Sequence, residues 1–306
     1  MAGRFSGVYC AVVTPMRGSQ IDTDVLTLHL RTLAAEGCDG VLLMGTTGEG
    51  PSLSLGEREM ILSAAIAANT GLKLLAGTGT SSLPETIHAT KRAFELGADG
   101  VVVVPPYYFR NVSIEGLRAF YGAVIEESVP SDGALIAYHI PPVSGIALPK
   151  ALLASLVDAY GSRVAGVKDS GGDMSYSLDL IASLPALDVF VGSERLLLQG
   201  LQAGAAGCIT AGANVLAPLC AAVLRAWRQG EPAEALQEQL TAVRVLIESV
   251  APAPATYKAL LAVRHGGPGW NVRPPLLNHA DNTVADLVER LRSHHLHALP
   301  WLAPQS

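Results

Sequence analysis

The feature that most constrains the fold of this chain is a short glycine pattern that occurs three times, each time directly before an apolar run. Two glycines three positions apart precede the runs VLLMG, VVVVP and CITAG; the pairs are Gly37 and Gly40, Gly97 and Gly100, and Gly204 and Gly207. The first glycine can adopt the left-handed conformation that ends a helix, and the second allows the chain to pack closely as it turns into a strand. Apolar, β-branched runs are typical of strands covered on both faces. The pattern predicts helices alternating with parallel strands.

Eight segments fit the strand pattern, namely 7–13, 40–44, 73–76, 100–104, 134–139, 164–168, 189–191 and 208–210. The connecting helices are expected to begin near Thr23, Ser54, Leu83, Ser113, Pro149, Met174, Glu194 and Ala213. Open doubly wound sheets usually have fewer strands, whereas eight such units close into one barrel. The fold class predicted for the 306 residues is therefore α/β, a (β/α)8 TIM barrel with additional C-terminal helices.

The residues after the eighth unit predict three further helices, at 233–251, 256–263 and 283–297. Pro252 and Pro254 are expected to separate the first two, because proline disrupts a helix interior. No flexible linker or low-complexity tract divides the chain. We expect a (β/α)8 barrel catalytic domain over 1–228 and a C-terminal helical extension packed on it over 229–306.

The composition of the chain limits the classes of partner that it can bind and its location. The formal net charge of −6 provides no basic field for nucleic acid or for anionic lipid, so a small-molecule partner is expected. The uncharged stretch 196–224 is interrupted by Gln199, Gln202, Asn214 and Pro218, which argues against a membrane span. The four cysteines form no CxxC pair, and the N-terminus carries no apolar stretch of export-signal length. A cytoplasmic location is expected.

Lys168 is the lysine best placed for chemistry, because it ends the apolar strand at 164–168 and working residues of barrels lie at the carboxyl ends of strands. Lys73 begins a strand, and Lys91, Lys150 and Lys258 belong to helices where a lysine is usually solvated. Enclosure in a barrel lowers a lysine pKa from about 10.4 toward roughly 7–8, and the neutral amine attacks ketones. The alternative is a structural pair with a buried carboxylate such as Asp169.

Two other strand ends carry polar groups that suit the same chemistry. The turn from Gly45 to Gly50 contains Thr46 and Thr47, whose hydroxyls and backbone N–H groups can hold a carboxylate. The alternative is an ordinary turn before a helix cap at Ser52 or Ser54. No lysine follows the last glycine, which excludes a phosphate loop. Tyr138 and the Tyr107–Tyr108 pair can transfer protons, although paired tyrosines also serve in packing.

The ordered set of these motifs resembles the dihydrodipicolinate synthase / N-acetylneuraminate lyase superfamily of pyruvate-dependent aldolases. The motifs are Gly45-Thr46-Thr47-Gly48-Glu49, Pro106-Tyr107-Tyr108, Tyr138-His139-Ile140-Pro141 and Gly166-Val167-Lys168-Asp169-Ser170. They lie at the ends of the second, fourth, fifth and sixth predicted strands. The likeness continues through Val191-Gly192-Ser193-Glu194, Gly207-Cys208-Ile209 and Arg273-Pro274-Pro275. It covers nearly the whole chain.

The resemblance implies a class I (Schiff-base) aldolase or lyase. Such an enzyme needs no cofactor, because its lysine forms an imine directly with pyruvate. It implies that Lys168 forms the imine, that Tyr138 transfers protons, and that Thr46 and Thr47 hold the pyruvate carboxylate. Tyr108 matches a tyrosine that completes the relay from a neighbouring subunit, which implies a homotetramer built from dimers. The other implied substrate-binding residues are Gly45, Gly192, Glu194, Ile209, Thr210, Val143 and Ser144.

The second substrate is left open by the same comparison. Val143 stands where the lysine-pathway synthases carry an arginine that binds the aldehyde's carboxylate, and its aliphatic side chain disfavours that reaction. 4-Hydroxy-tetrahydrodipicolinate synthase is therefore the alternative activity. Glu194 and Thr210 match positions that contact sugar hydroxyls in lyase-type members, which favours a 2-keto-3-deoxy sugar acid, a sialic-acid-like compound or a 4-hydroxy-2-oxo acid. A keto-acid sensor without turnover is the alternative of another class.

The sequence also predicts the roles of its histidines and whether it binds a metal. Strand alternation directs His139 away from Tyr138, toward the helices, which favours a supporting role over substrate contact. No strand-end cluster of His, Asp and Glu has the spacing of a metal site, so no metal is expected. His294, His295 and His297 are interpreted as a solvated helix face.

Overall fold

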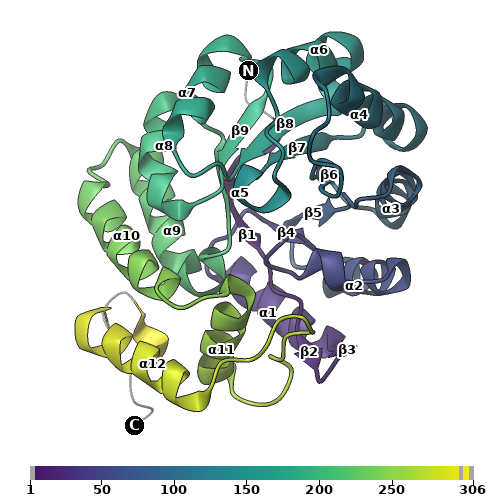
Figure 1. Ribbon diagram of the computed structural model, residues 1–306. Helices are drawn as coiled ribbons and strands as arrows, with labels where there is room; N and C mark the ends of the chain where they lie inside the picture. The colour runs from purple at the N-terminus through teal and green to yellow at the C-terminus, as the bar shows by residue number, and fades with distance from the viewer. Residues whose placement is uncertain (1–3, 296–298, 303–306) are drawn as a thin grey trace.

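A closed barrel of eight parallel strands forms the centre of the molecule in the computed structural model, which describes residues 4–295 and 299–302 (Figure 1). The strands are β1 (Gly7–Ala11), β4 (Gly40–Leu43), β5 (Lys73–Gly77), β6 (Gly100–Val103), β7 (Leu135–His139), β8 (Val164–Asp169), β9 (Asp188–Val191) and β10 (Gly207–Thr210). β1 pairs with both β4 and β10, which closes the ring. The predicted fold class is confirmed, and the strand bounds differ from the predicted ones by at most two residues.

The helices surround the barrel as the glycine pattern predicts (Figure 1). They are α1 (Thr23–Ala35), α2 (Leu55–Ala68), α3 (Leu83–Leu96), α4 (Ile114–Ser128), α6 (Lys150–Tyr160), α7 (Met174–Ser183), α8 (Leu197–Ala203) and α9 (Ala213–Gln229). Gly97 and Gly204 are the C-caps of α3 and α8, with φ of 108° and 100°. The unit expected to begin at Glu194 opens instead with a 3-10 turn, η3 (Glu194–Leu196), before α8.

A hairpin and a short helix were not predicted. A hairpin of β2 (Met16–Arg17) and β3 (Gln20–Ile21) follows β1, and the four-residue helix α5 (Pro141–Ser144) follows β7. Two-residue strands are too short to show the alternation by which a strand is recognised in a sequence. The hairpin contacts the C-terminal part of the chain, because Met16 forms a bridge with Trp270.

Three helices follow the barrel: the first two pack against α9, and the third packs on those two (Figure 1). They are α10 (Glu234–Glu248), α11 (Ala253–His265) and α12 (Asp281–His295). α10 ends three residues earlier than predicted, and α11 begins three residues earlier. Pro254 does not separate helices but lies in the first turn of α11, where a missing N–H costs no intrahelical bond. His297 lies outside the described residues, as do the side chains of His294 and His295.

Strand side chains divide into two cores. Along β1, Tyr9 belongs to the cluster inside the barrel, whereas Val8 and Cys10 belong to the core between strands and helices. β4 repeats this alternation, with Leu42 inside and Val41 outside. Successive residues of a strand point to opposite faces. The interior cluster is Phe5, Tyr9, Leu42, Leu75, Val102, Ala134, Ile136, Tyr138, Ile140, Ala165, Phe190 and Ile209.

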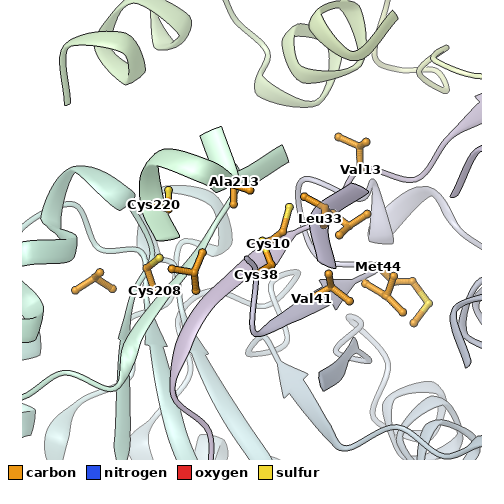
Figure 2. Close-up of a cluster of buried hydrophobic side chains, with 14 of the residues drawn as sticks. Cys10, Val13, Leu33, Cys38, Val41, Met44, Cys208, Ala213 and Cys220 are labelled. Atoms are coloured by element: carbon orange, nitrogen blue, oxygen red, sulfur yellow. The ribbon is translucent and has the colours of Figure 1, made fainter. Parts of the chain in front are cut away.

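The four cysteines are free and buried. They belong to the outer core, in which Leu33 of α1 and Ala213 of α9 also take part (Figure 2). Burial raises the pKa of the Cys38 thiol to about 12, with smaller contributions from the carboxylates of Glu36 and Asp39. These thiols act as small apolar side chains. Within the part of the chain that the structure describes, no helix is long and apolar enough to span a membrane.

Candidate active site

Lys168 and Tyr138 lie side by side at the carboxyl end of the barrel. Both are the second-last residue of their strand, β8 and β7, and they are paired in the register between the two strands. Val167 belongs to the outer core, so alternation places Lys168 on the inner face, where Tyr138 also lies. The Nζ atom is 4.1 Å from the centre of the Tyr138 ring, and Lys168 is only 4% exposed.

The alternative pairing of Lys168 with Asp169 is wrong. Asp169 points to the opposite face of β8, where its Oδ1 accepts from the backbone N of Gly171 (2.8 Å) and its Oδ2 from Ser177 Oγ of α7 (2.6 Å). Among the described residues, no Asp or Glu oxygen lies within the 4.0 Å of an ion pair from Lys168 Nζ. The amine therefore lies in the barrel without a carboxylate that would hold it as a structural cation.

The pKa of the Tyr138 phenol is lowered from its ordinary value. Burial acts to raise this pKa, but the positive charge of Lys168 and side-chain hydrogen bonding with Lys168, Thr46 and Ser170 together outweigh it. The phenol thus lies near both the strand-end amine of β8 and the turn after β4. Proton transfer between a phenol and groups within hydrogen-bond reach is the action of a general acid and base.

The turn after β4 is built from glycines and two left-handed residues. Met44 and Glu49 have φ of 57° and 56°, and a side chain on Gly50 would meet the Met44 carbonyl oxygen at 2.1 Å. The turn is closed by Gly50 N donating to Gly45 O (3.0 Å). Ser54 caps α2 through a capping box, as the alternative of a helix cap predicted. The cap lies after the turn and does not explain the conformation of the turn itself.

Thr46 is exposed at this turn, whereas Thr47 is buried. Thr46, Gly45, Tyr107 and Tyr138 share the wall of a small cavity of about 40 Å³. The sequence named Tyr107 only as one of a tyrosine pair, and the resemblance gave the site role to Tyr108. The strand ends of β4, β6 and β7 therefore meet at one cavity next to Lys168.

Tyr108 does not belong to this wall. Its side chain is 76% exposed on the segment after β6, next to Phe109, which is 72% exposed. The two rings pack edge to face, with centroids 5.2 Å apart. The two rings therefore form a small apolar patch at the surface.

Three expected substrate contacts are engaged elsewhere. Glu194 is fully buried, pairs with Arg244 of α10 (3.2 Å), and accepts a hydrogen bond from Thr210. Ser144 is 1% exposed, and its Oγ lies 3.0 Å from the carbonyl oxygens of both Ile140 and Ile146. Because internal partners occupy these groups, the structure does not present Glu194, Thr210 or Ser144 to a substrate.

The remaining expected residues lie around the barrel mouth or in its core. Val143 is 58% exposed on α5, and Ile209 is fully buried in the interior cluster. Gly192 follows β9, and a side chain there would meet Ser170 Oγ at 2.1 Å. His139 points to the helices as expected: its ring stacks on Tyr176 at 4.0 Å, and its Nδ1 accepts from Leu148 N (3.1 Å).

Lys258 is the lysine whose predicted environment is wrong. It was expected to be solvated on a helix, but its side chain is fully buried on α11 and pairs with Glu49 of the turn (2.5 Å). The apolar residues Tyr257, Leu260 and Leu261 around it carry the signal, since they place Lys258 on a buried part of α11. The described residues contain no group of three or more His, Cys, Asp and Glu side chains that could hold a metal ion.

Comparisons with known proteins agree with this architecture. The model of the dihydrodipicolinate synthetase family matches residues 4–294. The chain is 38% identical to an uncharacterized DapA-like lyase of Chloroflexus aurantiacus, over 92% of this chain and 94% of that one. It is 35% identical to the 4-hydroxy-tetrahydrodipicolinate synthase of Synechococcus sp. strain CC9605, over 92% and 93%.

A solved structure gives the same result. YagE, a prophage protein of the dihydrodipicolinic acid synthase family from E. coli K12 in complex with pyruvate, superposes with a TM-score of 0.89 at 26% identity. The superposition covers 95% of this chain and 98% of that one. The fold and the family match define a (β/α)8-barrel enzyme that acts on carbon–carbon bonds.

The chain belongs to the dihydrodipicolinate synthetase family. Enzymes of this family are pyruvate-dependent aldolases and lyases, which react with pyruvate through a lysine Schiff base and need no separate cofactor.

Proposed function

We propose that the protein is a class I aldolase that cleaves a 4-hydroxy-2-oxo acid to pyruvate and an aldehyde, or joins the two, through an imine on Lys168. The observation that carries the proposal is the environment of this amine: buried inside the barrel, beside the Tyr138 phenol, and without a carboxylate partner among the described residues. No carboxylate holds this amine as a structural cation, and an amine at the end of a barrel strand can act as a nucleophile toward a ketone.

The proposed cleavage begins with attack of the Lys168 amine on C2 of the 2-oxo acid. Tyr138 donates a proton to the departing hydroxyl, water leaves, and a protonated imine forms. Tyr138 then accepts the proton of the C4 hydroxyl as the C3–C4 bond breaks. The electron pair of that bond passes into the imine, which gives an enamine and releases the aldehyde. Protonation at C3 and hydrolysis return pyruvate and the free amine.

The proposal assigns the substrate carboxylate to the turn after β4. Thr46 lies in the cavity wall with Tyr138, and its hydroxyl and neighbouring backbone N–H groups are neutral donors for an anion. Thr47 is proposed to complete this site, with Gly45, Gly192 and Ile209 bounding the bound keto acid. YagE, which carries pyruvate, supports pyruvate as the keto acid.

The proposed substrates are a 2-keto-3-deoxy sugar acid, a sialic-acid-like compound or a 4-hydroxy-2-oxo acid. Val143 supports this choice over the synthase reaction, because an aliphatic side chain cannot bind the carboxylate of an acidic aldehyde. The relatives named 4-hydroxy-tetrahydrodipicolinate synthase, at 35% identity, keep that reaction as the second candidate.

We also propose that residues 1–228 form the catalytic domain and 229–306 an extension packed on it. The proposed assembly is a homotetramer of dimers in which Tyr108 enters a neighbouring subunit's site, and its exposed ring supports this role. The proposed location is the cytoplasm, which rests on the free, buried cysteines.

Borohydride reduction in the presence of pyruvate tests the imine. We expect a reduced pyruvate adduct on the peptide that contains Lys168, located by mass spectrometry, and no adduct in Lys168→Met. Aldol substrates should then release pyruvate when 2-keto-3-deoxygluconate, N-acetylneuraminate and 4-hydroxy-2-oxoglutarate are compared. An adduct without any turnover would indicate a keto-acid sensor, and failure to form the adduct would refute the proposal.

A further inference from the structure

We propose that the buried ion pair between Glu49 and Lys258 is a positioning device, through which the C-terminal extension holds the turn after β4 in its substrate-binding shape. The inference rests on the proposed function and deepens it, because it gives α11 a part in binding the keto acid's carboxylate. Neither residue is proposed to touch the substrate. Both are positioning residues that act through Thr46.

The carboxylate of Glu49 is bonded entirely to the C-terminal part of the chain. Its Oε1 is 2.5 Å from Lys258 Nζ, and its Oε2 accepts from the backbone N of Arg273 at 2.8 Å. Lys258 Nζ also donates to the carbonyl oxygen of Asn271 at 2.6 Å. Both charged side chains are fully buried. A barrel residue is thus locked by groups from more than two hundred positions later in the chain.

The same residue shapes the backbone that carries Thr46. The N–H of Glu49 donates to the carbonyl oxygen of Thr46 at 3.1 Å, so the Thr46 peptide is tied to the position of Glu49. Glu49 is held at a φ of 56°, in the left-handed region. A non-glycine residue in this region is strained and persists only where surrounding contacts hold it there. Lys258 and the backbone of Arg273 supply those contacts.

Simple attachment of α11 to the barrel does not require this pair. A buried ion pair contributes little net stability relative to well-packed apolar side chains, because both charges lose their hydration. α11 has other anchors: Leu260 and Leu261 are fully buried, and Arg264 pairs with Glu36 after α1. The ion pair instead fixes the orientation of the Glu49 carboxylate toward its donors. The fixed position of Glu49 in turn holds the backbone of the turn that carries Thr46.

The test compares the pyruvate dependence of adduct formation in two variants. Glu49→Gln/Lys258→Met removes both charges at similar volume and leaves an amide oxygen for the Arg273 N–H. We expect the pyruvate concentration for half-maximal borohydride trapping on Lys168, and KM, to rise about tenfold or more. The adduct at saturating pyruvate should stay complete, and kcat should change far less than KM. Arg264→Gln is the matched control on the same helix, with unchanged half-saturation expected.

Unchanged half-saturation in a folded double variant would overturn the proposal, as would an equal rise in Arg264→Gln. Circular dichroism and thermal unfolding establish whether each variant is folded. If the double variant does not fold, Lys258→Arg replaces it, because this change keeps the positive charge but displaces it. A pyruvate concentration for half-maximal trapping within twofold of that of the unaltered protein would then overturn the proposal. Failure of the proposed function looks different, because the unaltered protein would then form no adduct at any pyruvate concentration.

Discussion

Lys168 Nζ lies 4.1 Å from the centre of the Tyr138 ring, and the two residues are register partners on the neighbouring parallel strands β8 and β7. The closed barrel sets this relationship, because both side chains point inward at the same level. Each residue therefore forms part of the other's electrostatic environment. Lys168 provides the largest of the effects that lower the pKa of Tyr138, and together with hydrogen bonding they outweigh burial.

Replacing Lys168 by methionine should raise the pKa of Tyr138. The variant loses the cationic charge and the hydrogen bond that lower this pKa, and it keeps the burial that raises it. The ultraviolet absorbance of tyrosinate, measured against pH, gives the ionisation of Tyr138 as the difference from the matching Tyr138→Phe protein. An identical midpoint with and without Lys168 would contradict the relationship.

Tyr138→Phe should lower kcat by about 10²–10⁴-fold, the usual contribution of a general acid and base. The substitution removes one oxygen atom and keeps the ring beside Lys168. Trapping with borohydride should still place pyruvate on Lys168 after long incubation, because the amine is intact. A kcat within a few fold of the unaltered protein would show that Tyr138 transfers no proton in the rate-limiting step.

Tyr108→Phe and Lys168→Met should each inactivate the protein alone and complement each other when co-expressed. If Tyr108 enters a neighbouring site, a mixed dimer contains one intact site, so random pairing should restore about one quarter of full activity. Tyr138→Phe mixed with Lys168→Met is the control, since both residues belong to one subunit's site and no activity should return. Absence of complementation in the first mixture would argue that Tyr108 acts within its own subunit or not at all.

Val143→Arg should improve turnover of aldehydes that carry a carboxylate. Val143 is exposed on α5, so the longer side chain is tolerated with a stability change within about 0.5 kcal/mol. A charge-assisted hydrogen bond contributes about 1.5–3 kcal/mol, which predicts roughly a tenfold or larger rise in kcat/KM for aspartate semialdehyde. Kinetics with glyceraldehyde, which has no carboxylate, are the control. A parallel rise for both aldehydes would exclude carboxylate recognition as the cause.

His29 should make the protein less stable in acid. Burial lowers its pKa to about 3, and His265 and Arg264 add to the shift, while the Asn214 hydrogen bond opposes it. The folded chain keeps His29 neutral, whereas the unfolded chain takes up a proton below about pH 6.5. The free energy of unfolding should therefore fall by about 1.4 kcal/mol per pH unit from pH 6.5 toward 3 on account of this residue.

Urea unfolding at several pH values measures this slope. His29→Gln should reduce the slope by about one proton. Equal slopes in His29→Gln and the unaltered protein would show that other groups cause the acid sensitivity.

The alternation of strands and helices, and the place of Lys168 and Tyr138 at strand ends, follow from local features of the sequence. Glycines such as Gly97 adopt left-handed conformations that few other residues tolerate, and a continuous apolar run has to be covered on both faces. Strand alternation also predicts that His139 points to the helices, because side-chain direction depends only on position along the strand.

Partners across the fold were decided by tertiary packing alone. Lys258 has an ordinary helical position in the sequence, and only the approach of α11 to the turn after β4 brings it to Glu49. In the same way, Arg244 from α10 engages Glu194, a residue that its motif had assigned to a substrate. A charged side chain pairs with whatever group comes within a few ångströms. For residues far apart in the chain, that distance is set by the closure of the barrel and the docking of its last helices.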